Sequence, residues 1–181
     1  MRSKWVSKRE FEHLLAGLMP ENALALRVSE AYGVRIGDVL QMRHDDARSG
    51  YWSFKEQKTG KRRIVRLGGQ LQRELLRISG RVFVFEHRTD WRKHRTRQAV
   101  YKDLTRIAKA YRLQGVTPHS ARKIYSVEQY RASGGNLKKV QRLLNHSDEA
   151  VTILYALADE LSAVRKKRLT NRKFDVTMNI P

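Results

Sequence analysis

The chain has 181 residues, with 38 Lys and Arg against 18 Asp and Glu, and a formal net charge of +20 at pH 7. This length fits one domain with a substantial core, and so large a positive charge is tolerated when the partner is a polyanion, so DNA or RNA is the first expectation. The lack of Cys excludes disulfides, Cys-based zinc sites and Cys nucleophiles. No run reaches transmembrane length and no lipidation motif or apolar signal segment occurs, so we expect an intracellular, cytoplasmic protein with no membrane partner.

The N-terminal part of the chain predicts helices. Ser7 and Glu10 have capping-box spacing, and apolar residues follow them at helical intervals as far as Leu18. Met19-Pro20 ends this helix. A second helix is expected over residues 21–31 and a short third one over residues 36–42.

A change of period marks a β-hairpin in the next segment. Residues 51–54 and 64–67 are rich in aromatic and β-branched side chains, and they flank Lys58-Thr59-Gly60-Lys61. Two such runs around a turn that contains Gly are typical of antiparallel strands.

Helical spacing returns in the C-terminal half, after an apolar run at residues 82–85 that is either a short buried strand or an apolar loop. Val100, Leu104, Ile107, Ala108 and Tyr111 fall on one face of a predicted helix. The other helices are expected over residues 70–78, 120–132, 137–144 and 148–157. Together these elements predict a mainly α fold with a small antiparallel β-sheet, an α+β domain over residues 1–160.

Residues 161–181 form a tail of different character. Phe174, Val176, Met178 and Ile180 alternate with polar residues, as in a strand. Such a strand could complete its own sheet or add to the edge of a neighbour's. A frayed terminus is the alternative.

The region from Thr117 to Tyr155 carries groups suited to phosphodiester chemistry. Cleavage by a side chain needs neutralised phosphate oxygens, a deprotonated nucleophile and a proton for the leaving oxygen. His119 and Arg122 are one helical turn apart, His146 follows, and Tyr155 offers a phenol. Taken singly, each has an ordinary explanation as a solvated helix face, a loop or cap residue, or a core tyrosine.

Two upstream segments supply the complementary groups. Arg35 begins a short predicted helix, and Asp38 follows one turn later, where it could pair with the arginine and fix the guanidinium for bidentate phosphate contact. Lys58 is predicted at the tip of the hairpin, where a mobile loop could carry an ammonium into a site and withdraw it.

On these segments the chain resembles the catalytic domain of the tyrosine recombinases, the phage-integrase family. The resemblance covers residues 7–161, and each matching motif is weak alone but the combination and order are specific. The matching segments are Arg35-Ile36-Gly37-Asp38, Lys58-Thr59-Gly60, Thr117-Pro118-His119-Ser120-Ala121-Arg122, Leu143-Leu144-Asn145-His146-Ser147, and Tyr155.

The resemblance implies a role for each catalytic position. Tyr155 corresponds to the nucleophile that forms a 3′-phosphotyrosine link and releases a 5′-hydroxyl. Arg35 and Arg122 correspond to the clamp on the scissile phosphate, for which a permanently charged guanidinium is suited. No ATP and no metal or other cofactor is implied, because the phosphotyrosine conserves the energy of the bond.

The remaining three positions handle protons or hydrogen bonds. The resemblance makes His146 a further phosphate contact, His119 a proton-handling or hydrogen-bonding group, and Lys58 the general acid for the leaving oxygen. Lys55 and Lys61 are neighbouring alternatives to Lys58.

The sequence departs from the family's pattern at three points. Asn145 stands where many relatives have Gly, and Asp38 where many have Glu. Family members usually carry a core-binding domain before the catalytic domain, and here the chain begins where the catalytic domain is expected. We therefore expect either a fragment or a minimal member that works with a separate core-binding domain.

Basic residues outside the site are predicted to contact DNA. One set surrounds Trp91, just before the helix expected from residue 98, and another lies in the helix over residues 137–144. A charge run is often only a solvated face, but beside a phosphodiester site we favour phosphate contacts, which supply affinity without sequence information. The predicted contacts are Arg88, Arg92, Lys93, Arg95, Arg97, Lys138 and Lys139.

The resemblance implies site-specific cleavage and rejoining of double-stranded DNA, as in integration or excision of a mobile element of bacterial or phage origin. We expect a monomer free in solution and a tetramer on recombining DNA. Two alternatives remain: a type IB topoisomerase-like enzyme that only relaxes DNA, and a DNA-binding accessory protein or regulator that does not cut.

Overall fold

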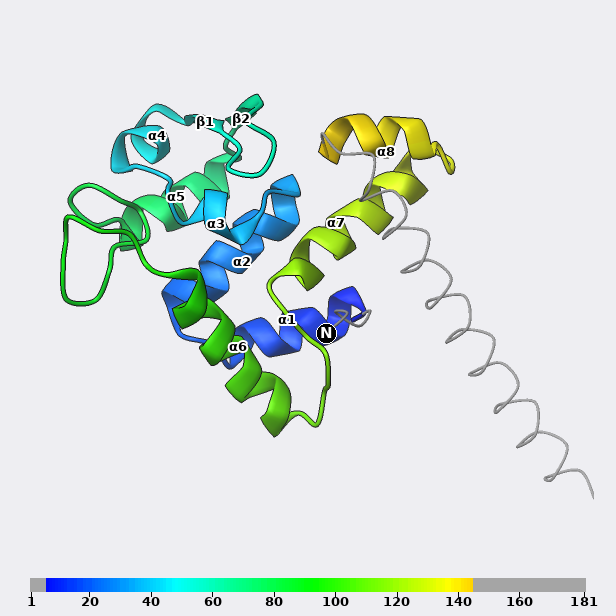
Figure 1. Ribbon diagram of the computed structural model, residues 1–181, viewed down its shortest axis with the longest axis horizontal. Coiled ribbons are helices and arrows are strands. Elements are labelled where there is room, and N and C mark those ends of the chain that lie inside the picture. Colours follow the sequence, from blue (N-terminus) through cyan, green and yellow to red (C-terminus); the bar gives the residue numbers. More distant parts are fainter. Residues whose placement is uncertain (1–5, 145–181) are drawn as a thin grey trace, which may run out of the picture.

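The computed structural model describes residues 6–144 of the chain (Figure 1). Its helices are α1 (Lys8–Ala16), α2 (Pro20–Tyr32), α3 (Ile36–Val39), α4 (His44–Ser49), α5 (Gly69–Ile78), α6 (Arg97–Ala110), α7 (His119–Ala132) and α8 (Leu137–Leu144). The strands β1 (Tyr51–Lys55) and β2 (Arg62–Arg66) form a two-stranded antiparallel sheet. The prediction of a mainly α fold with a small antiparallel sheet is therefore confirmed.

Local sequence signals determine where the first helix begins. The Ser7 hydroxyl accepts a hydrogen bond from the Glu10 amide, and the Glu10 carboxylate accepts one from the Ser7 amide, which completes the predicted capping box. The apolar face of α1 buries Phe11, Leu14 and Leu15 in the core. The sequence prediction for this helix is confirmed.

Helix α2 is the centre of the domain and packs against α1, α3, α5 and α7. It ends at Gly33, which has a φ of 60°. A Cβ atom at Gly33 would lie 2.3 Å from Cδ1 of Tyr125 on α7, so a side chain is excluded by space as well as by backbone conformation. Gly33 thus allows α7 to approach the C-terminal end of α2.

The hairpin has one buried face and one exposed face. Trp52 pairs with Val65 and Phe54 with Arg63 on the inner face, and the rings of Trp52 and Phe54 stack 4.1 Å apart. Tyr51 and Ile64 belong to the outer face and are exposed. This alternation confirms the predicted hairpin.

Three details differ from the sequence prediction. Helix α4 was not predicted, because it is short and buries only Ala47. Tyr111 was expected on the buried face of α6, but it lies past the last turn of that helix and is 54% exposed. The short helix expected over residues 36–42 ends at Val39. Of the two alternatives for residues 82–85, the structure agrees with an apolar run that is no regular strand: Phe83 makes an isolated bridge with Arg43, while Val84 and Phe85 are buried.

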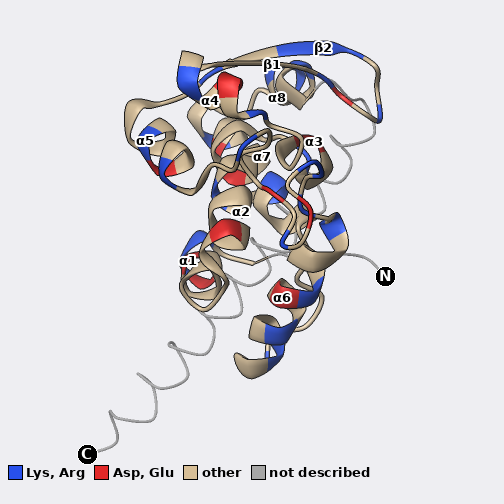
Figure 2. Ribbon diagram, turned by 90° about the vertical axis from the view of Figure 1, so that its left-hand side faces the viewer, with Lys and Arg blue, Asp and Glu red and all other residues tan. Residues whose placement is uncertain are grey.

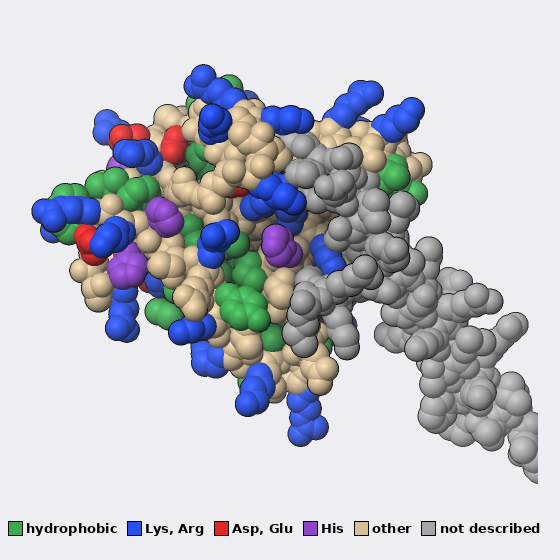
Figure 3. Space-filling view, in the orientation of Figure 1, with side chains coloured by type: hydrophobic (Ala, Val, Ile, Leu, Met, Phe, Trp, Pro, Cys, Tyr) green, Lys and Arg blue, Asp and Glu red, His purple; other side chains and the backbone are tan. Residues whose placement is uncertain are grey.

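The surface is strongly basic. Figure 2 shows basic residues on β2 and on several helices, and Figure 3 shows one face on which Lys and Arg far outnumber acidic side chains. Between residues 6 and 144, no helix is both long enough and apolar enough to cross a membrane.

Candidate active site

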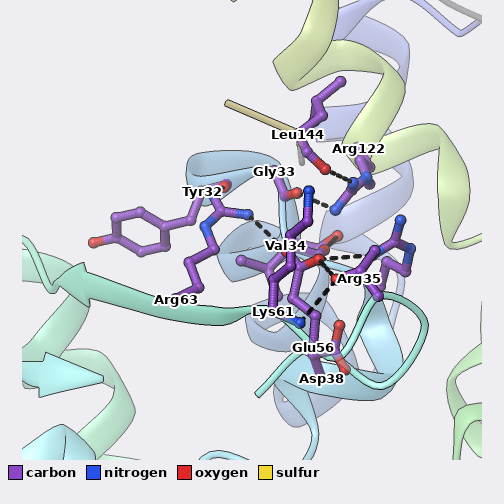
Figure 4. Close-up of polar contacts among 12 residues, drawn as sticks. Tyr32, Gly33, Val34, Arg35, Asp38, Glu56, Lys61, Arg63, Arg122 and Leu144 are labelled. Carbon is purple, nitrogen blue, oxygen red and sulfur yellow. Dashed lines mark hydrogen bonds and ion pairs between the residues drawn. The ribbon is translucent and has the colours of Figure 1, made fainter. Parts of the chain in front are cut away.

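The centre of the candidate site is an ion pair between Arg35 and Glu56 (Figure 4). Arg35 is the residue before α3 and has extended backbone angles, which directs the chain out of the turn that follows α2. Its Nη1 lies 3.3 Å from Oε2 of Glu56, and the two side chains are 12% and 1% exposed. The same Oε2 accepts a 2.8 Å hydrogen bond from the Thr59 hydroxyl. The hairpin loop is thereby joined directly to the start of α3.

Glu56 is ionised in this environment. Burial by itself raises the pKa of a carboxyl group. For Glu56 the hydrogen bond from Thr59 and the charges of Arg35, Arg122 and Arg63 outweigh burial, and the net result is a lowered pKa. Three arginines from separate elements therefore act on one carboxylate.

Arg122 lies on α7 and is 5% exposed. Its Nη1 donates a 2.6 Å hydrogen bond to the carbonyl oxygen of Gly33, and its Nη2 donates a 2.9 Å bond to that of Leu144. These are carbonyls at the C-terminal ends of α2 and α8, where helix backbone oxygens lack partners within the helix. The guanidinium is thus fixed in orientation close to Arg35 and Glu56, as Figure 4 shows.

Arg63 is a third arginine at this centre, and we did not predict it from the sequence. Its Nη2 donates to the Tyr32 carbonyl oxygen, and its Nη1 lies 3.6 Å from Oε1 of Glu56. One sequence signal could have indicated it, because the period of two places Arg63 on the same face of β2 as the buried Val65. A charged residue on the inner face of a strand requires a buried partner.

Asp38 has a different partner from the one expected. Among the described residues, the carboxylate that pairs with Arg35 is Glu56, whereas Oδ1 of Asp38 accepts a 3.0 Å bond from the Gln57 amide. Burial raises the pKa of Asp38, and the charge of Glu56 adds to this, while the Gln57 amide, Arg35 and Arg122 act in the opposite direction. Asp38 therefore fastens the hairpin loop to α3.

Lys58 is an exposed residue in the loop between β1 and β2. Hydrogen bonds join the residues at the base of this loop to one another and to α3. The Glu56 amide donates to the Lys61 carbonyl, the Gly60 amide donates to the Glu56 carbonyl, and the Gln57 side chain donates to the Gly37 carbonyl. Lys58 stands between two anchored residues.

His119 is the first residue of α7 and is exposed, one helical turn before Arg122. Pro118 precedes it as the N-cap, as expected for a helix start. The structure therefore places Arg35, Arg122 and His119 around the ends of α2, α3 and α7. His146 and Tyr155 lie outside the described residues, as do the helix predicted over residues 148–157 and the tail strand.

The predicted DNA-contact residues fall into two groups. Arg88, Arg92, Lys93, Arg97, Lys138 and Lys139 are exposed. Arg95, in contrast, is 8% exposed and pairs with Glu21 at 3.3 Å. Because Arg95 is not exposed like the other six and pairs with Glu21, we do not retain it as a DNA contact.

Two of the exposed residues have informative surroundings. Cδ of Arg97 lies 3.0 Å from the position of a Cβ on Gly37, so this arginine borders the start of α3, close to Arg35. The guanidinium of Arg92 lies over the ring of the exposed Trp91, with Arg81 also stacked on it, at 5.1 and 5.5 Å from the ring centre. Stacked Arg and Trp side chains are suited to contacts with sugars and bases.

No group of three or more His, Asp or Glu in residues 6–144 could hold a metal ion. The chemistry available in the described part of the site is that of fixed guanidinium groups beside two buried carboxylates. Guanidinium groups are suited to bind a phosphate diester through charge-assisted hydrogen bonds.

Comparisons with known proteins agree on one family. The phage integrase family matches residues 4–161 of the chain. A curated relative, the "Probable integrase/recombinase YoeC" of Bacillus subtilis (strain 168), is 28% identical over 148 residues, which are 75% of this chain and 72% of the relative.

Solved structures show the same fold at low sequence identity. A crystal structure of XerA recombinase matches with a TM-score of 0.67 and 21% identity, over 94% of this chain and 64% of that one. A lambda integrase(75-356) dimer bound to a COC' core site matches with a TM-score of 0.66 and 22% identity, over 81% of this chain and 59% of that one. The chain thus spans less than two thirds of these solved chains.

Proposed function

The chain belongs to the phage integrase family, and from this membership and the arginine centre we propose that it is a site-specific DNA recombinase that cleaves and rejoins strands through a 3′-phosphotyrosine intermediate. One observation carries the proposal: Arg35 and Arg122, 87 residues apart in the chain (122 − 35), lie close together beside the buried Glu56 (Figure 4). With Arg63, the three arginines at this centre outnumber its two carboxylates, Glu56 and Asp38, and the remaining positive charge favours an anionic ligand.

Each proposed role follows from the chemistry of the side chain. Arg35 and Arg122 bind the non-bridging oxygens of the scissile phosphate and stabilise the charge that develops there. The phenol of Tyr155 gives its proton to His119 as its oxygen attacks phosphorus, the bond from phosphorus to the 5′-oxygen breaks, and Lys58 gives that oxygen a proton. His119 and His146 complete the hydrogen bonds to the phosphate and the nucleophile.

The reverse step uses the same groups. A free 5′-hydroxyl attacks the phosphotyrosine, the tyrosine leaves, and the DNA strand is restored. Because one phosphodiester is exchanged for another, the reaction needs no ATP and no metal. If the 5′-hydroxyl comes from a second duplex, the result is strand exchange.

The proposed partner is double-stranded DNA. The exposed basic residues and the Arg81–Trp91–Arg92 stack support it, and among the proteins of the same fold is a lambda integrase tetramer bound to a Holliday junction, with a TM-score of 0.66 and 21% identity. We propose a monomer in solution, a tetramer on recombining DNA, and action on nucleoid DNA in the cytoplasm, with residues 1–160 as the catalytic domain and residues 161–181 as a tail.

The test is covalent capture on nicked DNA. A pool of duplexes with a randomised core and a nick that lets the short 5′-hydroxyl fragment diffuse away traps the covalent intermediate. The protein, alone and with a core-binding domain added in trans, should form an SDS-resistant adduct that Tyr155→Phe does not form. Sequencing of the captured DNA gives the target.

Two results would contradict the proposal. An adduct that persists in Tyr155→Phe excludes this nucleophile, and failure of the wild-type protein to form any adduct under either condition excludes cleavage. Relaxation of supercoiled DNA without exchange between two target sites would indicate a topoisomerase instead.

A further inference from the structure

Glu56 lies at the candidate site, but neither the sequence motifs nor the proposed reaction use it. It is 1% exposed and lies at the point where β1 enters the hairpin loop. One carboxylate oxygen contacts both Arg35 and Thr59, at 3.3 and 2.8 Å. The other lies 3.6 Å from Arg63. A single side chain therefore connects α3, the hairpin loop and β2.

These contacts are strong because the group is buried. A buried carboxylate is costly unless charged and hydrogen-bonded partners satisfy it. The lowered pKa of Glu56, in which hydrogen bonding and three arginines outweigh burial, shows that its partners favour the ionised form. Removing the negative charge of Glu56 would therefore leave the positive charges of Arg35 and Arg63 without the carboxylate that offsets them.

The same loop is held at a second place. The amide of Gln57 bonds Asp38, and its side-chain amide bonds the Gly37 carbonyl at 3.3 Å. Lys58 lies between Gln57, which bonds α3 directly, and Thr59, which bonds Glu56 and so is linked to Arg35 through that carboxylate. The position of Lys58 relative to Arg35 is consequently set by the contacts of Glu56 and Gln57.

We infer that Glu56 is a positioning residue that holds the Lys58 loop in register with the Arg35 guanidinium, so that the group that binds the phosphate and the group that protonates the leaving oxygen are aligned together. This inference rests on the proposed function. The alternative is a buried ion pair that only stabilises the fold.

The two explanations differ in their dependence on the leaving group. An oxygen leaving group needs a proton from Lys58, whereas a sulfur leaving group does not, because a thiol is a much stronger acid than an alcohol. Misplacement of Lys58 should therefore slow cleavage of an ordinary strand, but not cleavage of a strand with sulfur in place of the 5′-bridging oxygen. A loss of stability slows both substrates equally.

The experiment compares Glu56→Gln with the wild type on nicked DNA of the captured sequence, with either oxygen or sulfur at the bridging position. We expect single-turnover cleavage of the oxygen substrate to slow about 10- to 100-fold, the effect of losing a hydrogen bond to a charged group. On the sulfur substrate, the cleavage rate of Glu56→Gln should be close to that of the wild type, and the same should hold for Lys58→Ala. Glu56→Asp, which keeps the charge, should retain more activity than Glu56→Gln.

Two further variants secure the result. Glu74→Gln removes the same charge from an exposed pair with Arg27 and should leave both rates unchanged. Thr59→Val removes the hydroxyl bond to Glu56 and, within the same loop, the acceptor of the Lys61 amide. If Glu56→Gln does not fold, Thr59→Val provides the same test. Its cleavage of the oxygen substrate should slow by a smaller factor, and the sulfur substrate should again be cleaved at nearly the wild-type rate.

An unchanged rate for Glu56→Gln on the oxygen substrate would overturn the inference, and so would an equal loss on both substrates. In either case the wild-type adduct still forms and the proposed function stands. If the wild-type protein forms no adduct with either substrate, the proposed function fails and the inference fails with it.

Discussion

The Arg122 guanidinium donates a 2.6 Å hydrogen bond to the carbonyl oxygen of Gly33, 89 residues earlier in the chain. The neighbouring carbonyl, that of Tyr32, accepts from Arg63. The C-terminal end of α2 thus holds two arginines from two other elements. A residue proposed to bind phosphate is therefore also part of the packing between α2 and α7.

Arg122→Ala should reduce stability as well as activity. The change leaves the buried Gly33 and Leu144 carbonyls without this donor, and we expect the free energy of unfolding to fall by about 2–4 kcal/mol. Urea denaturation measures it. Arg142→Ala, at an exposed position on α8, is the control and should change the value by less than about 0.5 kcal/mol. Equal stability of the two variants would show that these bonds contribute nothing.

Gly33→Ala should be strongly destabilising because a methyl group there meets the Tyr125 ring. Gly134 has a nearly equal φ, 64° against 60°, but no heavy atom of the described residues lies within 4 Å of the place that its Cβ would take. We expect about 1–2 kcal/mol for Gly134→Ala, from backbone strain alone, and more than about 3 kcal/mol for Gly33→Ala. Thermal or urea denaturation of both variants would reveal the difference, and equal losses would contradict the close packing of α7 on α2.

Asp38→Asn should become more stable relative to the wild type as the pH rises. Burial raises the pKa of Asp38 in the folded protein, so ionisation costs folding free energy. That cost is absent below the pKa of an unfolded aspartate, about 3.9. It grows as the pH rises from there to the raised folded value and is constant above it. Urea denaturation of both proteins at several pH values from 3 upward should show the difference in the free energy of unfolding widening and then levelling off. A difference that narrows with rising pH would contradict the shift.

The same variant should lose activity, because Asp38 anchors the loop through the Gln57 amide. Asn keeps an acceptor for that amide, so we expect the cleavage rate to fall by less than for Glu56→Gln. Single-turnover capture on nicked DNA measures both. If the cleavage rate falls further for Asp38→Asn than for Glu56→Gln, Asp38 rather than Glu56 is the main residue that aligns the loop.

Arg92 and Arg95 offer a matched pair for DNA binding. Arg92 is exposed and stacked on Trp91, whereas Arg95 is buried against Glu21. If Arg92 neutralises one phosphate, Arg92→Gln should reduce the slope of log affinity against log salt concentration by about 0.9. Arg95→Gln should leave the slope unchanged and lower the stability instead. Fluorescence anisotropy of labelled DNA at several salt concentrations measures the slope for both variants. A reduced slope for Arg95→Gln would show that Arg95 contacts a phosphate after all.

The sequence was informative wherever a local pattern decides the structure. The capping box at Ser7, the alternation in the hairpin and the helical spacing in α6 to α8 all predicted elements that the structure confirms. Helix α4 lacked such a pattern because only Ala47 is buried in it. Tyr111 followed the helical period but lies past the last turn, where the period no longer determines burial.

The candidate site shows the same division. Motif order predicted Arg35 and Arg122 as site residues, but it could not predict Glu56 as the partner of Arg35, because that pair forms only when the hairpin folds back on α3. Arg95 was misjudged for a related reason. Its partner Glu21 is 74 residues earlier in the chain, so the sequence around Arg95 shows only a run of basic residues.

The bond from Arg122 to the Leu144 carbonyl has a consequence for reaction order. The bond holds the backbone at Leu144 beside the arginine centre. Tyr155 is 11 residues beyond Leu144 (155 − 144), so the two residues are at most roughly 40 Å apart. If the proposed nucleophile attacks a phosphate held by its own protomer, cleavage should therefore be a first-order event whose rate is independent of protein concentration.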